Sequence, residues 1–247
     1  MPRESEPSTA GLASSTEEAR PIETWLLSLG ALEYGDALDL QRRLAEARAA
    51  GRLPDVLVLL EHPPVVTLGR RGSLDDVLVP VEELERRGIA LHATSRGGLV
   101  TYHGPGQLVG YPILDLRAMG GDAHAYVRGL EEVILRFLHT VGLQGRRDPG
   151  YVGVWVDDEK VAAIGVAVSR GVTIHGFALN LDPDLDAFRL ITPCGIRDRG
   201  VTSVARLLGR AVDPSWARAE VARQFAEVFR RRLRPTSLAE IETAIDA

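Results

Sequence analysis

The pattern of hydrophobic positions predicts many short strands separated by a few helices. Apolar and β-branched residues gather in short runs, which are typical of strands covered on one or both faces. Two prolines in Glu61–Arg71 precede a further short strand. The longer runs predict strands at Ile22–Leu29, Asp55–Leu60, Ile89–Ala93, Leu99–Tyr102, Gln107–Leu116, Val152–Val156, Val161–Val168 and Val172–Leu181. Short turns join the last three runs, which therefore predict an antiparallel meander.

Other segments repeat their apolar residues with helical spacing. A helix over residues 32–50 has Ala37, Leu40, Leu44 and Ala47 on one face, and Asp122 is placed to cap a long helix that ends near Val141. Further helices are predicted at Pro80–Arg87, Asp184–Leu190 and Ser203–Leu208, after Asp213 and Pro214, and after the capping box Ser237–Glu240. Residues 1–20 are too polar to fold alone and are expected to form a disordered leader, followed by a single domain over 21–247.

The segment Arg96–Pro112 is unusually rich in glycine. Five of its seventeen residues are Gly and two are Pro, and they flank the short strand Leu99–Tyr102. Glycine permits positive φ and close approach to the backbone, so one interpretation is a binding loop that carries Arg96, Thr101, His103 and Gln107. The other interpretation is an ordinary glycine-rich hairpin. These residues alone do not separate the two.

Composition and charge narrow the class of protein. The chain has 247 residues, 45% of them hydrophobic, with a formal net charge of -5. An acidic balance argues against a general nucleic-acid binder. No apolar run approaches the roughly 20 residues that span a bilayer, and the N-terminus lacks a signal pattern. We therefore expect a soluble cytoplasmic protein that binds neither nucleic acid nor membrane.

The chain contains one lysine, Lys160, and one cysteine, Cys194. A single cysteine excludes an intrachain disulfide and leaves no cysteine-rich metal site. A surface lysine in a polar turn and an inert buried cysteine are the ordinary interpretations. As a pair they fit covalent acyl transfer, because an amine can accept the thiol proton and an ammonium stabilises the thiolate nucleophile.

Several common catalytic motifs are missing from the sequence. We find no HExxH, no P-loop pattern and no GxGxxG, so metalloprotease, P-loop and dinucleotide-binding functions have no support. His62, which precedes a proline, is expected to be structural, and His175 to be a hydrogen-bonded strand residue. His103 could act as a base or could hold the glycine loop.

Four ordered motifs resemble those of the lipoyl(octanoyl) transferases of lipoate biosynthesis. They are RGGLVTYHGPGQ from Arg96, GVWVDDEKVAAIG from Gly153, HGFALNL from His175 and TPCG from Thr192. The resemblance covers roughly 22–208. It implies an α+β fold, the biotin/lipoate protein ligase-like catalytic domain, in which helices flank a mixed β-sheet.

The resemblance also implies an activity, partners and site residues. The octanoyl group would pass from octanoyl-acyl carrier protein to a lysine of apo lipoyl domains or the glycine cleavage H protein, as the first step of endogenous protein lipoylation. Cys194 would carry the acyl thioester and Lys160 would lower the pKa of its thiol. No metal or cofactor is implied, and we expect a monomer. The substrate-binding residues implied by the motifs are Arg96, Gly97, Gly98, Leu99, Val100, Thr101, Tyr102, His103, Ala163, Ile164, Gly165, Gly176, Phe177 and Ala178. Of these, Leu99, Val100 and Tyr102 are expected to help line an acyl tunnel.

Two other functions are compatible with the same fold. A lipoate ligase would activate a free acid with ATP and would not need a cysteine at position 194. A binding or regulatory module would hold an acyl group without passing it on. The arginines near Arg70, Arg146 and Arg197 are expected to meet an acidic carrier protein or lipoyl domain.

Overall fold

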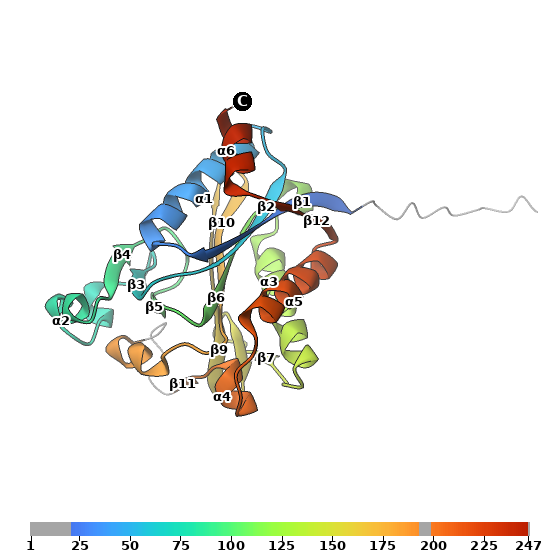
Figure 1. Ribbon diagram of the computed structural model, residues 1–247. Helices are drawn as coiled ribbons and strands as arrows, with labels where there is room; N and C mark the ends of the chain where they lie inside the picture. Colours follow the sequence, from blue (N-terminus) through green and yellow to red (C-terminus); the bar gives the residue numbers. More distant parts are fainter. Residues whose placement is uncertain (1–20, 193–198, 247) are drawn as a thin grey trace, which may run out of the picture.

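The computed structural model describes residues 21–192 and 199–246. In that part of the chain, a nine-stranded mixed sheet has the order β12-β1-β2-β6-β10-β9-β8-β7, and β11 pairs with β9 (Figure 1). The contacts β12–β1, β1–β2 and β11–β9 are parallel, whereas the others are antiparallel. The strands are β1 (Ile22–Ala31), β2 (Asp55–Glu61), β6 (Gln107–Ile113), β7 (Arg146–Arg147), β8 (Val154–Val156), β9 (Glu159–Ser169), β10 (Val172–Asn180), β11 (Gly200–Val201) and β12 (Arg231–Thr236).

Helices cover both faces of this sheet (Figure 1). On one face, α3 (Ala123–Thr140) and α5 (Pro214–Val228) pack their apolar sides onto the inner strands, and Asp122 caps α3 by accepting from the backbone N–H groups of His124 and Ala125. On the other face, α1 (Tyr34–Ala49) packs over β6 and β10 and beside α6 (Leu238–Asp246), in a core that also includes residues of β1 and β2. The short helix α4 (Val204–Leu208) follows β11. The expected helix-flanked mixed sheet is therefore present.

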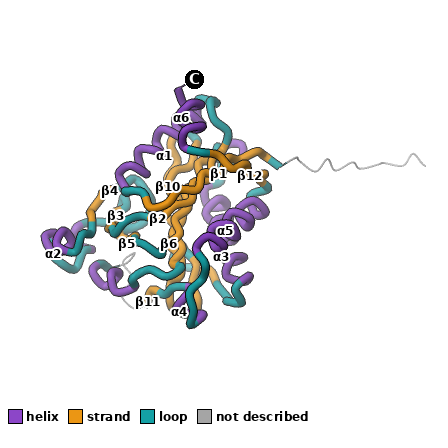
Figure 2. The backbone as a smooth tube through the Cα atoms, in the orientation of Figure 1, coloured by secondary structure: helices purple, strands orange, loops and turns teal. Residues whose placement is uncertain are grey.

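A second, three-stranded sheet lies beside the large one. Its order is β4 (Ala90–Ala93), β3 (Val65–Leu68) and β5 (Val100–His103), and α2 (Val81–Arg86) connects β3 to β4 (Figure 2). The described residues also contain three short 3-10 turns: Leu74–Asp76, Arg117–Met119 and Leu185–Leu190. The last of them packs against β5 through the ring contact of Phe188 with Tyr102. This arrangement leaves the other face of β5 turned toward the large sheet.

The sequence-based elements agree with the structure except at three short strands. The meander β8–β9–β10 is antiparallel as predicted, and the helices begin and end within a few residues of their expected bounds. Strands β7, β11 and β12 were not predicted, because the first two contain two residues each and β12 is rich in arginine. Within 21–192 and 199–246, no helix is long and apolar enough to cross a membrane.

Candidate active site

A narrow cavity of about 50 Å³ lies between the large sheet and the small sheet. It collects residues from α1, β5, β6, β9, β10 and the glycine-rich loop, which are far apart in the sequence. Its walls are Tyr34, Arg96, Gly97, Gly98, Thr101, His103, Val109, Tyr111, Ala163, Ile164, Gly165, His175, Gly176, Phe177 and Ala178. The three segments singled out by their motifs therefore meet at one place.

Small residues form the floor of the cavity. In the antiparallel pair β9–β10, Ala163 lies opposite Ala178 and Gly165 opposite Gly176. Positions two apart in a strand face the same side, so these four residues make one patch without bulky side chains. Strand β6 adds Val109, which lies opposite Ala178. The result is an apolar groove lined by backbone and methyl groups.

Alternation along β5 divides its residues between two environments. Thr101 and His103 line the cavity, whereas Val100 and Tyr102 are buried on the opposite face, in the core under β5 and the turn Leu185–Leu190. Val100 and Tyr102 therefore do not line this cavity, contrary to the expectation, and Leu99 is not among its lining residues. Side chains alternate between the two faces of β5, and the two that face the cavity are the polar residues Thr101 and His103.

The Arg96 side chain braces the glycine-rich loop. It is buried, and its guanidinium donates to the backbone oxygen of Thr67 at 2.7 Å and to the Thr67 hydroxyl at 2.9 Å. The loop also contacts the floor, since the Gly97 N–H donates to the Val166 oxygen at 3.0 Å. Gly98 has a φ of 90°, which requires glycine. Arg96 thus fixes the shape of this wall through β3.

A chain of hydrogen bonds leads from the cavity to the strand that carries Lys160. Gln107 donates through Nε2 to Asn180 Oδ1 at 2.8 Å, and Asn180 donates to the Thr202 oxygen at 2.9 Å. The Gln107 oxygen must then accept from His103 Nδ1 at 2.6 Å, so His103 carries its proton on Nδ1. Finally, the Thr202 N–H donates to the Lys160 oxygen at 3.0 Å.

Burial keeps His103 neutral. Loss of solvent around the ring, with repulsion from His62 as the next cause, lowers the pKa of His103 to about 3. Its Nε2 atom is then a hydrogen-bond acceptor near neutral pH. The imidazole is consequently a poor candidate for taking a proton from an ammonium group. Its hydrogen bond to Gln107 instead holds the glycine-rich turn between them. Of the two roles left open for His103, the structural one has the geometric support.

His62 has the structural role expected from its position before a proline. Its Nδ1 lies 2.7 Å from the Leu32 oxygen, to which it must donate, and its Nε2 lies 2.7 Å from the Tyr111 hydroxyl, from which it accepts. Burial lowers the pKa of His62 to about 4. The histidine thereby orients Tyr111, one of the cavity walls. Tyr111 and Val109 lie in the glycine-rich segment but were not singled out there, and Tyr34 lies in a helix of ordinary composition.

His175 stands at the end of the cavity with an unusual backbone. Its φ is 62°, a left-handed conformation that is uncommon outside glycine, and its N–H donates to Gln41 Oε1 of α1 at 2.8 Å. The ring Nε2 lies 3.0 Å from the Ser95 hydroxyl. Burial, followed by the charges of Arg96 and Arg42, lowers the pKa of His175 to about 4. The predicted hydrogen-bonded strand histidine is confirmed, but it also lines the cavity.

Lys160 is buried and is held by its neighbours. Its side-chain nitrogen donates to the Val152 oxygen at 3.3 Å and lies 4.8 Å from the centre of the Trp155 ring. A surface lysine in a polar turn is therefore the wrong interpretation, since the side chain is 7% exposed. Gly153 lies beside it with a φ of 127°: a Cβ there would make ordinary contact with Lys160 Cε at 3.4 Å but would lie only 2.6 Å from the Ala162 oxygen.

Cys194 lies outside the described residues, but the chain on each side of it is anchored. Before it, the Thr192 N–H donates to the Asp76 oxygen at 2.8 Å. After it, Arg199 forms an ion pair of 2.5 Å with Asp148 and packs its guanidinium 5.4 Å from the centre of the Trp155 ring. The indole that contacts Lys160 thus also contacts the residue five positions beyond the cysteine.

The described part of the chain contains no group of three or more His, Cys, Asp or Glu residues placed to hold a metal ion. Its ionisable residues near the cavity are instead neutral histidines and tyrosines, together with Arg96. Burial is the main cause that raises the pKa of Tyr34 and Tyr111 above the ordinary value. At neutral pH the walls therefore offer hydroxyl and imidazole groups without negative charge.

Comparison with known proteins gives one consistent result. Residues 33–229 match the family model of the lipoyl protein ligase A/B catalytic domain. An octanoyltransferase of Caldicellulosiruptor saccharolyticus is 47% identical over 87% of this chain and 92% of its own length. An octanoyltransferase of Chloroflexus aurantiacus is 50% identical over 85% of this chain and 96% of its own length.

A solved structure supports the same fold. The bipartite lipoate protein ligase of Thermoplasma acidophilum superposes with a TM-score of 0.66, at 19% identity, over 92% of this chain and 91% of that one. At this identity the likeness concerns the arrangement of the two sheets and their helices. It agrees with the fold that the four motifs implied.

Proposed function

Because this chain belongs to the octanoyltransferases of the lipoyl protein ligase A/B family and is an acyltransferase, we propose that it forms an octanoyl thioester on Cys194. The donor is octanoyl-acyl carrier protein, and the acceptor is a lysine of an apo lipoyl domain or of the glycine cleavage H protein. The protein acts as a monomer in this proposal. The observation that carries it is the cavity where the glycine loop and the segments 163–165 and 176–178 meet.

The apolar floor of the cavity suits an octanoyl chain. Such a chain presents only hydrocarbon surface to its site, and each buried methylene contributes about 0.8 kcal/mol, so six methylenes contribute roughly 5 kcal/mol. Small residues at Ala163, Gly165, Gly176 and Ala178 let the chain lie close to the strand backbones. The same four positions belong to the segments proposed to bind substrate. Arg96 and His103 support them by shaping the opposite wall.

The first step exchanges one thioester for another. Lys160 takes the thiol proton of Cys194, and the thiolate attacks the carbonyl carbon of the octanoyl donor. A new S–C bond forms on Cys194 as the S–C bond of the carrier breaks, and the carrier thiolate receives the proton from the Lys160 ammonium. The exchange is nearly balanced in free energy, so no nucleotide is needed. Burial of Lys160 and its contacts with Val152 and Trp155 support this assignment, because they restrict its side-chain nitrogen to one place.

The second step forms the amide product. The neutral amine of the acceptor lysine attacks the Cys194 thioester, an N–C bond forms and the S–C bond breaks. The proton lost by the amine passes through Lys160 to the cysteine sulfur, which restores the starting enzyme. Formation of an amide from a thioester runs downhill, and this free-energy drop drives the overall transfer.

Mass spectrometry of the protein incubated with octanoyl-acyl carrier protein tests the intermediate. We expect a mass increase of one octanoyl group on Cys194, which disappears when an apo lipoyl domain is added. Cys194→Ala should form no adduct and transfer nothing. An unchanged transfer rate in Cys194→Ala would refute the thioester mechanism.

Lys160→Arg separates charge from proton transfer, because arginine keeps the positive charge and does not release its proton at working pH. We expect the variant to lose most of its transfer rate while its fold is retained. Full activity would reduce Lys160 to an electrostatic partner of the thiolate. Acylation that depends on ATP and free octanoate would instead indicate a ligase, and an adduct that never leaves Cys194 would indicate a binding module.

A further inference from the structure

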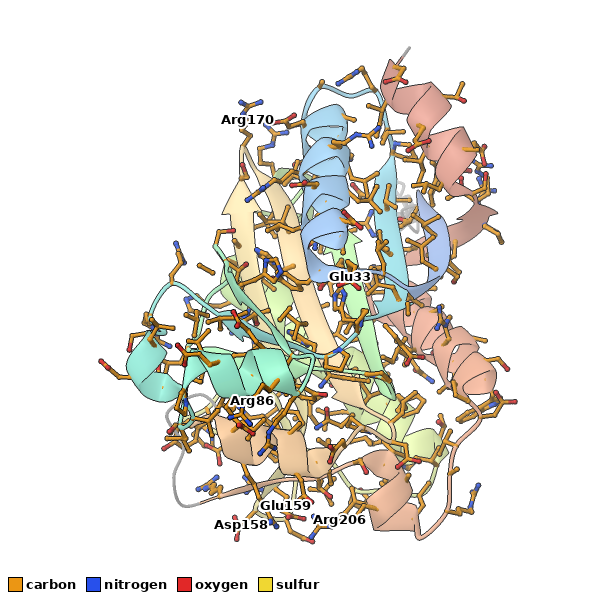
Figure 3. All side chains as sticks on the ribbon, turned by 60° about the vertical axis from the view of Figure 1, so that its left-hand side comes forward. Glu33, Arg86, Asp158, Glu159, Arg170 and Arg206 are labelled. Atoms are coloured by element: carbon orange, nitrogen blue, oxygen red, sulfur yellow. The ribbon has the colours of Figure 1, made fainter. Side chains whose placement is uncertain are left out.

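The cavity has a near end at the level of Ala163 and Ala178 and a far end at His175. Strand β9 starts beside Lys160 at Glu159, and Arg170 follows its last residue; Figure 3 labels Glu159 and Arg170 at opposite ends of the β9–β10 hairpin. The near end also carries His103, whose partner Gln107 lies opposite Asn180 on β10. At the far end, His175 lies opposite Val166.

The far end is closed by polar groups. His175 has a positive φ within β10, and hydrogen bonds hold the residue at both its backbone N–H and its ring. Behind the ring, the Tyr34 hydroxyl donates to the Thr94 hydroxyl at 3.1 Å. The glycine loop meets the floor at the same level, where the Gly97 N–H donates to the Val166 oxygen. Small apolar residues therefore end at a wall of imidazole and hydroxyl groups.

The length of the apolar floor matches one size of acyl chain. Ala163 and Val166 are three residues apart, and at about 3.3 Å per residue the strand covers roughly 10 Å between them. An octanoyl group has seven carbon–carbon bonds of about 1.5 Å, and its extended zigzag measures roughly 9 Å. A thioester carbon held at the level of Ala163 would thus place the terminal methyl just before His175.

We propose that His175 is the specificity-determining residue that limits acyl chain length, with the terminal methyl of an octanoyl group resting against its ring. This inference rests on the proposed octanoyl transfer. A decanoyl chain carries two more methylenes and would have to displace the ring from its place beside Ser95. Doing so would break a buried hydrogen bond and bring hydrocarbon against polar groups that need partners. A shorter chain fits but leaves part of the floor uncovered.

The experiment replaces His175 with glycine. A φ of 62° is easily adopted by glycine, so His175→Gly removes the ring without straining the backbone. Arg170→Gly is the matched control, because Arg170 has a φ of 51° and is exposed at the end of the hairpin, away from the cavity. The values of kcat/KM are measured with hexanoyl, octanoyl, decanoyl and dodecanoyl carriers.

We expect the ratio of decanoyl to octanoyl transfer to rise by about tenfold in His175→Gly, the value of two additional buried methylenes. The unchanged enzyme and Arg170→Gly should both discriminate against decanoyl. An unchanged ratio in a folded, octanoyl-active His175→Gly would overturn the proposal, as would equal use of octanoyl and dodecanoyl carriers by the unchanged enzyme. If His175→Gly does not fold, His175→Asn, which also tolerates positive φ, should shift the ratio in the same direction.

A binding measurement separates this inference from the transfer mechanism. Calorimetric titration with octanoate and decanoate reports the length of the cavity even when no acyl group is transferred. Suppose that no acyl group is transferred, but the protein binds octanoate more tightly than decanoate and His175→Gly loses this preference. That result would reject the proposed function and keep the length limit. Normal octanoyl transfer without any preference in binding or kinetics would reject the length limit alone.

Discussion

Three buried histidines should make the free energy of unfolding fall steeply below neutral pH. Burial lowers the pKa of His62 to about 4, of His103 to about 3 and of His175 to about 4, from an ordinary value of 6.5. The unfolded chain therefore binds protons that the folded chain does not, and stability is lost as the pH falls through 6.5 toward these folded values. Above about pH 7.5 these histidines are neutral in both the folded and the unfolded chain, so the free energy of unfolding no longer changes with pH through them.

The magnitude follows from proton linkage. Between pH 7 and pH 5.5, a group with an unfolded pKa of 6.5 that stays neutral in the fold contributes roughly 1.2 kcal/mol of destabilisation. The three histidines together then contribute roughly 3 to 4 kcal/mol, a large part of the typical 5 to 15 kcal/mol of a folded protein. Carboxyl groups such as Asp115 and Asp148, with pKa values near 2, affect stability mainly below this pH range.

Urea unfolding at pH 7 and pH 5.5 measures this difference, with the unfolding slope checked for constancy between the two conditions. His62→Gln should remove about a third of the pH dependence, since it removes one of three such groups. His139→Gln is the control, because His139 is exposed on α3 and its replacement should leave the pH dependence unchanged. A difference below about 1 kcal/mol between the two pH values would refute the reasoning that the three rings are buried in the neutral form.

Three further substitutions test separate contacts. Asp55→Ala should cost about 3 to 5 kcal/mol in urea unfolding, because it leaves the buried Arg231 without the carboxylate 2.8 Å away; a cost below 1 kcal/mol would contradict the ion pair. Gly153→Ala should cost about 1 to 3 kcal/mol in urea unfolding, given its φ of 127° and the 2.6 Å from an added Cβ to the Ala162 oxygen; an unchanged free energy of unfolding would contradict this strain. Asp122→Ala should cost about 1 kcal/mol through loss of the α3 cap, with no change in transfer rate.

Periodicity predicted the inner strands well and the outer strands poorly. The runs at Asp55–Leu60 and Val172–Leu181 are continuous because those strands are covered on both faces, and this burial left a clear pattern. Strand β12 lies at the edge of the sheet, and its sequence RRLRPT carries no such pattern. Its place is determined by pairing with β1 and by the ion pair of Arg231 with Asp55, which is distant in sequence. Contacts of that kind are invisible to local pattern.

The candidate site was also predicted only in part, because some of its residues are brought together by contacts distant in sequence. The motif segments are local in sequence, and the structure brings residues of the first three of the four motifs together at the cavity. Tyr34 and Tyr111 were missed because their role comes from packing between elements. Val100 and Tyr102 were placed on the wrong side, since a motif marks a stretch of chain while strand alternation decides which side chains face the cavity.

The small residues on β9 and β10 set limits on how this protein can be stabilised by design. Glycine and alanine are weak strand formers, so Ala163, Gly165, Gly176 and Ala178 are obvious positions at which an engineer would introduce valine or threonine. Here that choice would fill the groove, and at Gly176 even a methyl group would meet the Gly110 oxygen at 2.1 Å. Thermostable variants are better sought at the helix ends and the outer strands. The centre of the sheet retains its low intrinsic strand preference because its shape is needed.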